Sequence, residues 1–216
     1  MYLSLIKKRI EMKSLEERVA YARRLAVNRK KYGDFSNEQD VHRMICDMAG
    51  GCKRETQNLL YIKIGKDANR FYIQSDCLLD EEIVHSCGYE IVSVKNEGTI
   101  LDSIQNGDQV MLRAKLAPVE KRVAVCYSLA NDTKKRTTWI NRLAECCGFH
   151  FVDIPQEGAM DHIRWQKKGY GDSWTNAFLY TGEIKITDKN VFVQAMKSGV
   201  GKYKAYGCGM MMVSER

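Results

Sequence analysis

The sequence has little proline and lacks the patterns that mark secretion, zinc binding or membrane insertion. Its 216 residues include only two prolines, Pro118 and Pro155, and no low-complexity segment. The eight cysteines form no Cys-x-x-Cys pair and no Cys/His cluster with zinc spacing. No apolar run reaches the roughly 18 residues that cross a bilayer, and no signal-peptide segment follows the basic residues of positions 1–10. We therefore expect a cytoplasmic protein with no membrane-spanning segment.

An excess of basic residues favours an anionic partner without naming it. Lysine and arginine number 34 against 27 acids, which gives a formal net charge of +7. A moderate excess of this kind is compatible with nucleic acid, an anionic membrane surface or no partner at all. Apolar residues make up 44% of the chain, enough for the core of one domain or of two small ones.

Glycine and lysine are concentrated, and acids are missing, in residues 197–212, which read KSGVGKYKAYGCGMMM. The glycines of this stretch are Gly199, Gly201, Gly207 and Gly209. Apolar residues at helical spacing precede it, with Asp188 as the N-cap, and the apolar run 210–213 is typical of a buried strand. The sequence therefore predicts the order helix, glycine-rich loop, strand.

Such a loop suits a phosphate group. Glycines let a backbone approach a ligand closely, and successive N–H groups form a concavity for phosphate oxygens, to which Lys202 and Lys204 add positive charge. The same residues also describe a turn that closes a sheet, with lysines that are only solvated. The phosphate loop of nucleotide-binding proteins is excluded, because GxxxxGK[ST] is missing and the helix precedes the loop.

The C-terminal stretch carries a family resemblance. Gly199-Val200-Gly201, Lys202 and the run 204–209 (KAYGCG), followed by an apolar tail, resemble the C-terminal signature of the CRISPR precursor-RNA endoribonucleases. The type they resemble most is CasE, from the type I-E Cascade system. Residues 180–188 are similar to the strand that enters the last helix in that family, and the initial MYLS resembles its N-terminus. The resemblance covers most of the chain.

The order of expected elements predicts an α+β protein of two tandem ferredoxin-like (βαββαβ) domains. In the first half we expect strands at 2–6, 58–64, 70–75, 89–94 and 109–116, and helices at 14–31, between Ser36 and Gly50, and at 78–85. Ser36-x-x-Gln39 caps the second of these helices, and its buried stripe consists of Val41, Met44, Ile45 and Met48. In the second half we expect strands at 122–127, 149–154, 163–166, 177–186 and 210–213, and helices at 133–147 and from 188. The predicted domains are 1–117 and 118–216, divided at Ala117-Pro118, where the family has Asn-Pro.

The first helix is an insertion relative to the family, spanning about 14–34. Ser14-x-x-Glu17 is a capping box that starts it. We expect its buried stripe to consist of Leu15, Val19, Ala22 and Ala26. The opposite face is basic, and its charges fit a solvated surface as well as contact with RNA.

One of the four histidines stands in a motif. His85, His150 and His162 have none, which favours structural or surface roles. The run 40–43 (DVHR) resembles the Y-x-x-H-R segment of the family. The resemblance implies that His42 is the principal catalytic residue, with Arg43 in contact with RNA. Metal-independent RNA cleavage needs proton transfer near neutral pH, which imidazole supplies, and cations that stabilise the phosphorane.

The sequence departs from the family beside this histidine. Gln39 stands at the position of the family's tyrosine, and a family lysine one turn after the histidine falls near Asp47. Glutamine cannot act as a base. Either another group compensates, or the enzyme is a slow, single-turnover one. The candidates for that group are Tyr32, Tyr203, Lys202 and Lys204.

A second basic segment, 164–171 (RWQKKGYG), reads as a hairpin. The resemblance implies that Arg164, Lys167 and Lys168 contact the RNA repeat hairpin. Proteins recognise an A-form stem mainly by shape and phosphate contacts, because its major groove is deep and narrow. An exposed, charged β-turn without a ligand would have the same sequence.

The resemblance implies a metal-independent endoribonuclease without cofactor. It would cleave CRISPR precursor RNA at the 3′ base of the repeat stem-loop, leave 2′,3′-cyclic phosphate and 5′-hydroxyl ends, and stay bound to the product beside other Cascade subunits. Gln39 keeps a non-catalytic repeat-binding subunit open as an alternative. A generic RNA-binding module of the RRM type is a third reading, but its aromatic strand, [KR]-G-[FY]-[GA]-F-V-x-[FY], is absent.

Overall fold

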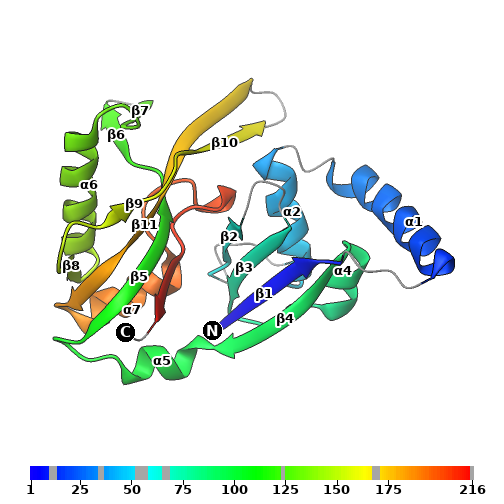
Figure 1. The fold of residues 1–216 in the computed structure, drawn as a ribbon, viewed down its shortest axis with the longest axis horizontal. Coiled ribbons are helices and arrows are strands. Elements are labelled where there is room, and N and C mark those ends of the chain that lie inside the picture. Colours follow the sequence, from blue (N-terminus) through cyan, green and yellow to red (C-terminus); the bar gives the residue numbers. More distant parts are fainter. Residues whose placement is uncertain are drawn as a thin grey trace.

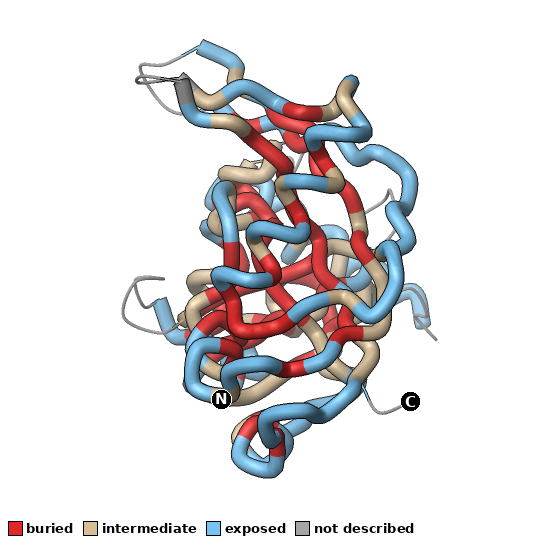
Figure 2. The backbone as a smooth tube through the Cα atoms, turned by 90° about the vertical axis from the view of Figure 1, so that its left-hand side faces the viewer, coloured by how far each residue is buried: buried red, intermediate tan, exposed pale blue. Residues whose placement is uncertain are grey.

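The chain folds into two halves that lie side by side, each built on an antiparallel sheet (Figure 1). A computed structural model describes residues 1–9, 14–33, 37–51, 58–64, 69–122, 125–166 and 171–214. In Figure 2 the buried segments run through the interior of the molecule, while the segments around its outside are largely exposed. The buried apolar side chains form one main cluster in each half, so the two halves have separate cores.

The N-terminal half has the ferredoxin-like strand order β2-β3-β1-β4. Its elements are β1 (Tyr2–Lys8), α1 (Leu15–Tyr32), α2 (Glu38–Met48), β2 (Leu60–Ile64), β3 (Arg70–Ser75), α4 (Glu81–Ser86) and β4 (Tyr89–Asn96). The strand β1 lies between β3 and β4, with Ser4 opposite Ile73 and Val94. The helix α2 packs on this sheet through the predicted stripe of Val41, Met44, Ile45 and Met48, all buried.

The C-terminal half repeats this order with the strands β8-β11-β5-β12. After the connecting helix α5 (Glu97–Ser103), its elements are β5 (Gln109–Leu116), β6 (Val119–Arg122), β7 (Val125–Ser128), α6 (Thr133–Cys146), β8 (Phe149–Phe151), β9 (Gln156–Glu157), β10 (Asp161–Gln166), β11 (Asp172–Ile186), α7 (Lys189–Ser198), the 3-10 turn η1 (Lys204–Tyr206) and β12 (Met211–Ser214). The prediction of two tandem ferredoxin-like units is confirmed.

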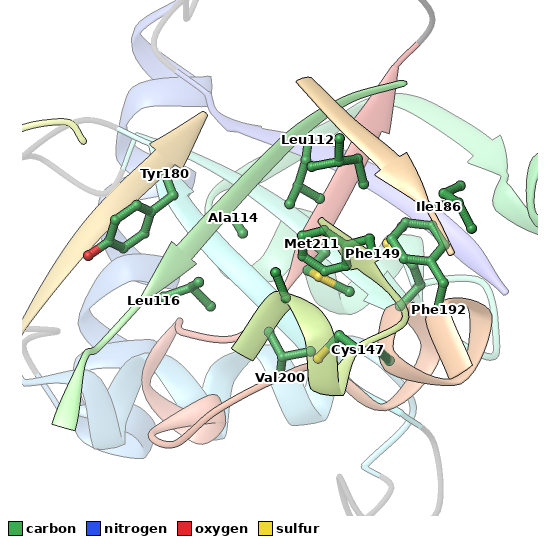
Figure 3. Close-up of a cluster of buried hydrophobic side chains, with 14 of the residues drawn as sticks. Leu112, Ala114, Leu116, Cys147, Phe149, Tyr180, Ile186, Phe192, Val200 and Met211 are labelled. Carbon is green, nitrogen blue, oxygen red and sulfur yellow. The ribbon is translucent and has the colours of Figure 1, made fainter. Parts of the chain in front are cut away.

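The core of the C-terminal half forms between its sheet and the helices α6 and α7 (Figure 3). Leu112 and Met211 come from the neighbouring strands β5 and β12. Phe149 of β8 meets Phe192 of α7 edge-on, with ring centroids 5.7 Å apart. As predicted, α7 begins at Asp188, whose Oδ1 accepts hydrogen bonds from the backbone N–H groups of residues 190 and 191.

The strand β5 belongs to the C-terminal sheet, which corrects its predicted place in the first domain. It pairs with β11 on one side and β12 on the other. The predicted boundary after Ala117 placed this strand with the wrong sheet, since the two sheets divide between β4 and β5. The single strand predicted at 122–127 is also wrong: β6 and β7 form a separate hairpin, with Glu120 opposite Tyr127. Apolar alternation locates a strand, but the choice of sheet depends on distant partners.

The inserted helix α1 starts as predicted but faces the other way. The backbone N–H of Glu17 donates to Ser14 Oγ at 3.1 Å. The predicted buried stripe is wrong, because all four of its residues are exposed, Leu15 by 75%. The helix instead buries Asn28 and Tyr32 at its C-terminal end. It projects from one end of the molecule, so its short apolar residues have no sheet to cover (Figure 1).

The segments on both sides of the glycine-rich loop contact the N-terminal half. Met210 is fully buried against Leu60 and Ile62 of the N-terminal sheet. Gln74 of β3 donates from Nε2 to the carbonyl oxygens of Met196 and Lys197 at 3.0 and 3.1 Å. These contacts fix the end of α7, and the loop that follows it, against the first half.

Candidate active site

The helix α2 presents the predicted catalytic histidine from a well-capped first turn. Asn37, one residue after the predicted cap, is the N-cap, and its Oδ1 accepts from the backbone N–H groups of Gln39 and Asp40 at 2.9 and 3.2 Å. Ser36 lies outside the described residues. His42 follows three residues after Gln39, and residues at this spacing share a helix face.

That face is tied to the glycine-rich loop. The hydroxyl of Tyr206 donates to Gln39 Oε1 at 3.3 Å. The hydroxyl of Tyr61 lies 3.1 Å from the carbonyl oxygen of Ala205 and 3.3 Å from Glu38 Oε2. We call residues 38–43 of α2 together with residues 199–209 the seam, because they join the two halves. The seam brings the helix of His42 against the loop of Lys202 and Lys204.

The side chains of His42 and Arg43 point to different surroundings. His42 is half-buried, and its ring nitrogens lie 3.7 and 3.8 Å from the sulfur of Cys46, one turn further along the helix. Arg43 is 55% exposed and pairs with Asp40 at 3.6 Å. An exposed guanidinium beside a half-buried imidazole suits a polyanion that covers this end of α2.

Aromatic rings hold the loop against β10. Trp165 stacks on Tyr206 with centroids 4.7 Å apart and planes at 15°, and lies 5.1 Å from Tyr203. Burial raises the pKa of Tyr203 and of Tyr206, so both phenols stay protonated at neutral pH and can donate hydrogen bonds. The stacking therefore presents the Tyr206 hydroxyl to Gln39.

The glycines of the loop are required by packing. A Cβ on Gly199 would lie 2.8 Å from the Leu60 side chain, and one on Gly209 only 2.3 Å from the carbonyl oxygen of Val200. One on Gly207 would lie 3.1 Å from the Tyr61 ring. At Gly201 the nearest atom is 4.0 Å away, and only its φ of +70° favours glycine. Close approach to β2 and within the loop thus explains three of the four glycines, and RNA contact at these positions remains a prediction.

The two predicted phosphate lysines are held differently. The ammonium of Lys204 donates to the carbonyl oxygens of Ser198 and Gly199 at 2.9 and 3.1 Å, at the negative end of the α7 dipole. Lys202 is exposed, and its Nζ lies 2.8 Å from the sulfur of Cys126, a contact that raises the pKa of Lys202. Lys202 can turn to a ligand without releasing a helix end, and Lys204 cannot.

The predicted basic hairpin is described only in part. Arg164 on β10 is exposed and pairs with Asp172 across the hairpin. Lys167 and Lys168 lie outside the described residues. The helix α2 contacts β10 as well as η1, so the base of the hairpin adjoins the seam.

Comparison with known proteins decides the family. A family model described as CRISPR associated protein matches residues 1–215. The chain belongs to this family of CRISPR associated proteins. The resemblance noted in the C-terminal stretch is thereby confirmed.

Solved structures share the fold of this CRISPR associated protein over its whole length. A CRISPR endoribonuclease Cse3 bound to a 19-nucleotide RNA has a TM-score of 0.75 at 16% identity, covering 99% of this chain and 98% of that one. The protein Cas6e from Escherichia coli K-12 has a TM-score of 0.68 at 13% identity, with full coverage of both chains. A chain of a CRISPR RNA-guided surveillance complex has 0.67 at 17%, also with full coverage. No curated protein sequence matches the chain.

Sequence reasoning missed the tyrosine that contacts Gln39. Tyr32, a candidate partner for the site, instead donates its hydroxyl hydrogen bond to Asp47 at 2.8 Å. Asp47 lies about 140° around the axis of α2 from His42, so Tyr32 is not on the histidine's face. The tyrosine that contacts Gln39 is Tyr206, and its position within the glycine-rich run is the signal that could have identified it.

In the described part of the chain, no three His, Cys, Asp or Glu side chains gather as metal ligands, and no helix there is long and apolar enough to span a membrane.

Proposed function

We propose that this chain is an endoribonuclease that cleaves CRISPR precursor RNA at the 3′ base of the repeat stem-loop and stays bound to the product. The seam carries this proposal, because it holds the helix that bears the half-buried His42 against the glycine-rich loop that bears the exposed Lys202. The shared fold with Cse3 and Cas6e supports it. By the same likeness, its partners are the repeat RNA and the other subunits of a Cascade complex.

The chemistry needs only groups of the chain and of the RNA. The 2′-oxygen attacks the adjacent phosphorus, the bond from phosphorus to the 5′-oxygen breaks, and a 2′,3′-cyclic phosphate and a 5′-hydroxyl result. The 2′-hydroxyl loses a proton and the leaving 5′-oxygen gains one; His42 carries one of these transfers, since imidazole exchanges protons near neutral pH, and water carries the other. In this proposal, Arg43 and Lys202 supply the positive charge that stabilises the phosphorane.

Gln39 limits what α2 itself can contribute. Its amide accepts the Tyr206 hydrogen bond and offers no proton at neutral pH. A reaction that depends on one titrating residue is slower than one with a matched acid and base. This observation favours the second candidate, a repeat-binding subunit without useful catalysis.

Incubation with the repeat RNA of the host in excess EDTA tests the proposal. The expected result is a single cut at the 3′ base of the stem, with a cyclic phosphate on the upstream fragment. Tight binding without a cut over hours would instead establish the non-catalytic subunit. A requirement for added Mg²⁺ would contradict the metal-independent mechanism.

A further inference from the structure

A cavity of about 720 Å³ opens between the β6–β7 hairpin and one face of α6. Its apolar lining comes from Val119, Leu129, Trp139 and Leu143. Its cationic lining comes from Lys121, Lys134, Lys135 and Arg142, against a single acid, Glu120. The cavity thus combines an indole with four positive charges, outside the seam described above.

These cations have little to neutralise them. Lys121, Lys134 and Arg142 are exposed and make no ion pair with any residue that the structure describes, and Lys135 has only a loose pair with Asp132 at 3.5 Å. Arg136 of α6, which does not line the cavity, is different, because Glu157 neutralises it at 2.7 Å. Like charges gathered around an apolar floor repel one another, and an anionic ligand relieves that repulsion.

The cavity reaches the seam through a second cavity of about 480 Å³, which shares Leu143 and Cys146 with it and is also lined by Gly199 and Gly201. The Trp139 ring that lines it is also the atom group nearest to a Cβ at Gly201, at 4.0 Å. The sulfur of Cys126, on β7, contacts the ammonium of Lys202 at 2.8 Å. A strand bound at Lys202 therefore needs to travel only past Gly201, the loop glycine with open space above it, to enter the cavity.

We propose that this cavity binds a nucleotide of the single-stranded RNA that flanks the repeat stem-loop. The base stacks on Trp139, and the adjoining phosphates lie against Lys121, Lys134 and Arg142. Stacking on an aromatic ring within a basic groove is how proteins hold single strands without reading sequence. Continuity with Lys202 and the presence of the indole favour RNA over an acidic protein segment. This inference rests on the proposed function and adds a subsite to it.

Binding of three RNAs, measured by fluorescence anisotropy, tests the subsite. The first is the repeat stem-loop with blunt ends and a 2′-deoxy nucleotide at the cleavage position. The second and third add a short oligouridine to its 5′ side and to its 3′ side, respectively. We expect one extension to tighten binding roughly ten-fold. The variant Lys134→Ala/Arg142→Ala should lose this gain and bind the blunt stem-loop normally. Trp139→Leu, which keeps an apolar side chain, should lose most of it.

The variant Lys95→Ala/Lys185→Ala is the matched control, since both lysines are exposed and lie outside the cavity lining. It removes the same charge and should keep the gain. Equal affinity of the wild type for blunt and extended RNA would overturn the proposal and leave an acidic segment as the occupant to seek. Equal losses of affinity for blunt and extended RNA in Lys134→Ala/Arg142→Ala would also overturn it. If the wild type binds no stem-loop, the proposed function fails, and free oligouridine, compared between wild type and Lys134→Ala/Arg142→Ala, still decides the subsite.

Discussion

The helices α2 and α6 occupy the same place in their ferredoxin-like halves but use their polar residues in opposite ways. The first turn of α2 reaches across to the other half, through Gln39 and Glu38. The first turn of α6 makes its polar contacts within its own half. Arg136 donates from Nε and Nη2 to the carboxylate of Glu157 at 2.9 and 2.7 Å, and its guanidinium lies over the ring of Phe178. One architecture thus places a contact between domains at one helix and an ion pair of a buried arginine within its own half at the other.

The comparison teaches that the burial of a polar side chain on a helix decides whether it acts in stability or remains available to a ligand. Arg136 and Arg142 are separated by less than two turns of α6, yet Arg136 is buried and Arg142 is exposed. In α2 the corresponding contrast lies between the half-buried His42 and the exposed Arg43. Variants at these positions separate chemistry, stability and binding.

The largest effect is expected at His42. His42→Ala should reduce cleavage by roughly 10²–10⁴-fold, because proton transfer contributes mainly in the transition state. Repeat RNA affinity should stay within a few-fold. Single-turnover cleavage and anisotropy measure the two, and wild-type cleavage by the variant would remove His42 from the mechanism.

The ion pair that the buried Arg136 makes on α6 should contribute strongly to stability. Arg136→Met removes the partner of Glu157 and of the carbonyl oxygens of Leu129 and Ala130, and should cost roughly 2–4 kcal/mol of unfolding free energy. Arg142→Met, on the exposed face, should change it by less than about 0.5 kcal/mol. Urea unfolding of both variants checks the contrast. Equal changes would mean that the burial of Arg136 contributes nothing.

The pair of Arg136 and Glu157 should also make the free energy of unfolding depend on pH. Burial raises the pKa of Glu157, but the hydrogen bonds from Arg136 and Tyr180 outweigh burial and hold it below its usual value. A carboxyl with a lowered folded pKa stabilises above its unfolded pKa, about 4.3, and loses that contribution as pH falls through the lower value. At pH 6 the melting temperature of Glu157→Gln should be lower than that of the wild type. Between pH 6 and pH 3 it should fall less steeply, because the variant has no carboxyl at this position to protonate.

The loop glycines should differ from one another. Gly209→Ala brings a Cβ onto the Val200 carbonyl at a φ of +84° and should cost about 3 kcal/mol. Gly201→Ala has open space and should cost about 1 kcal/mol, mostly from its positive φ. Thermal melting ranks the two. Similar melting temperatures would contradict the packing explanation.

The smallest effects are expected at the loop lysines. Lys202→Ala should weaken binding of cognate and unrelated stem-loops alike by a few-fold, and lower the salt slope by about one phosphate contact. Lys204→Ala should instead cost about 0.3–1 kcal/mol of stability, because it uncaps α7. Unchanged affinity and salt slope in the double variant would show that the loop only closes the sheet.

Local patterns predicted the elements, and distant contacts decided how they were used. The bounds of β3 and β5 and the stripe of α2 followed from apolar periodicity, and the start of α1 from its cap. Periodicity did not predict that β5 joins the second sheet, nor that α1 packs against the molecule through Asn28 and Tyr32. The contact between Tyr206 and Gln39 joins residues 167 positions apart, which no local pattern encodes.

The pairing of β5 with β12 has a consequence for synthesis on the ribosome. One edge of β5 (109–116) stays unpaired until residues 211–214 have been made, because β12 pairs with it. The contact of α2 with η1 likewise requires residues 204–206. By contrast, every strand that the structure describes in the N-terminal sheet has been made by residue 96. The first half can thus fold while the second is still being translated, and the seam forms only when the glycine-rich loop has emerged.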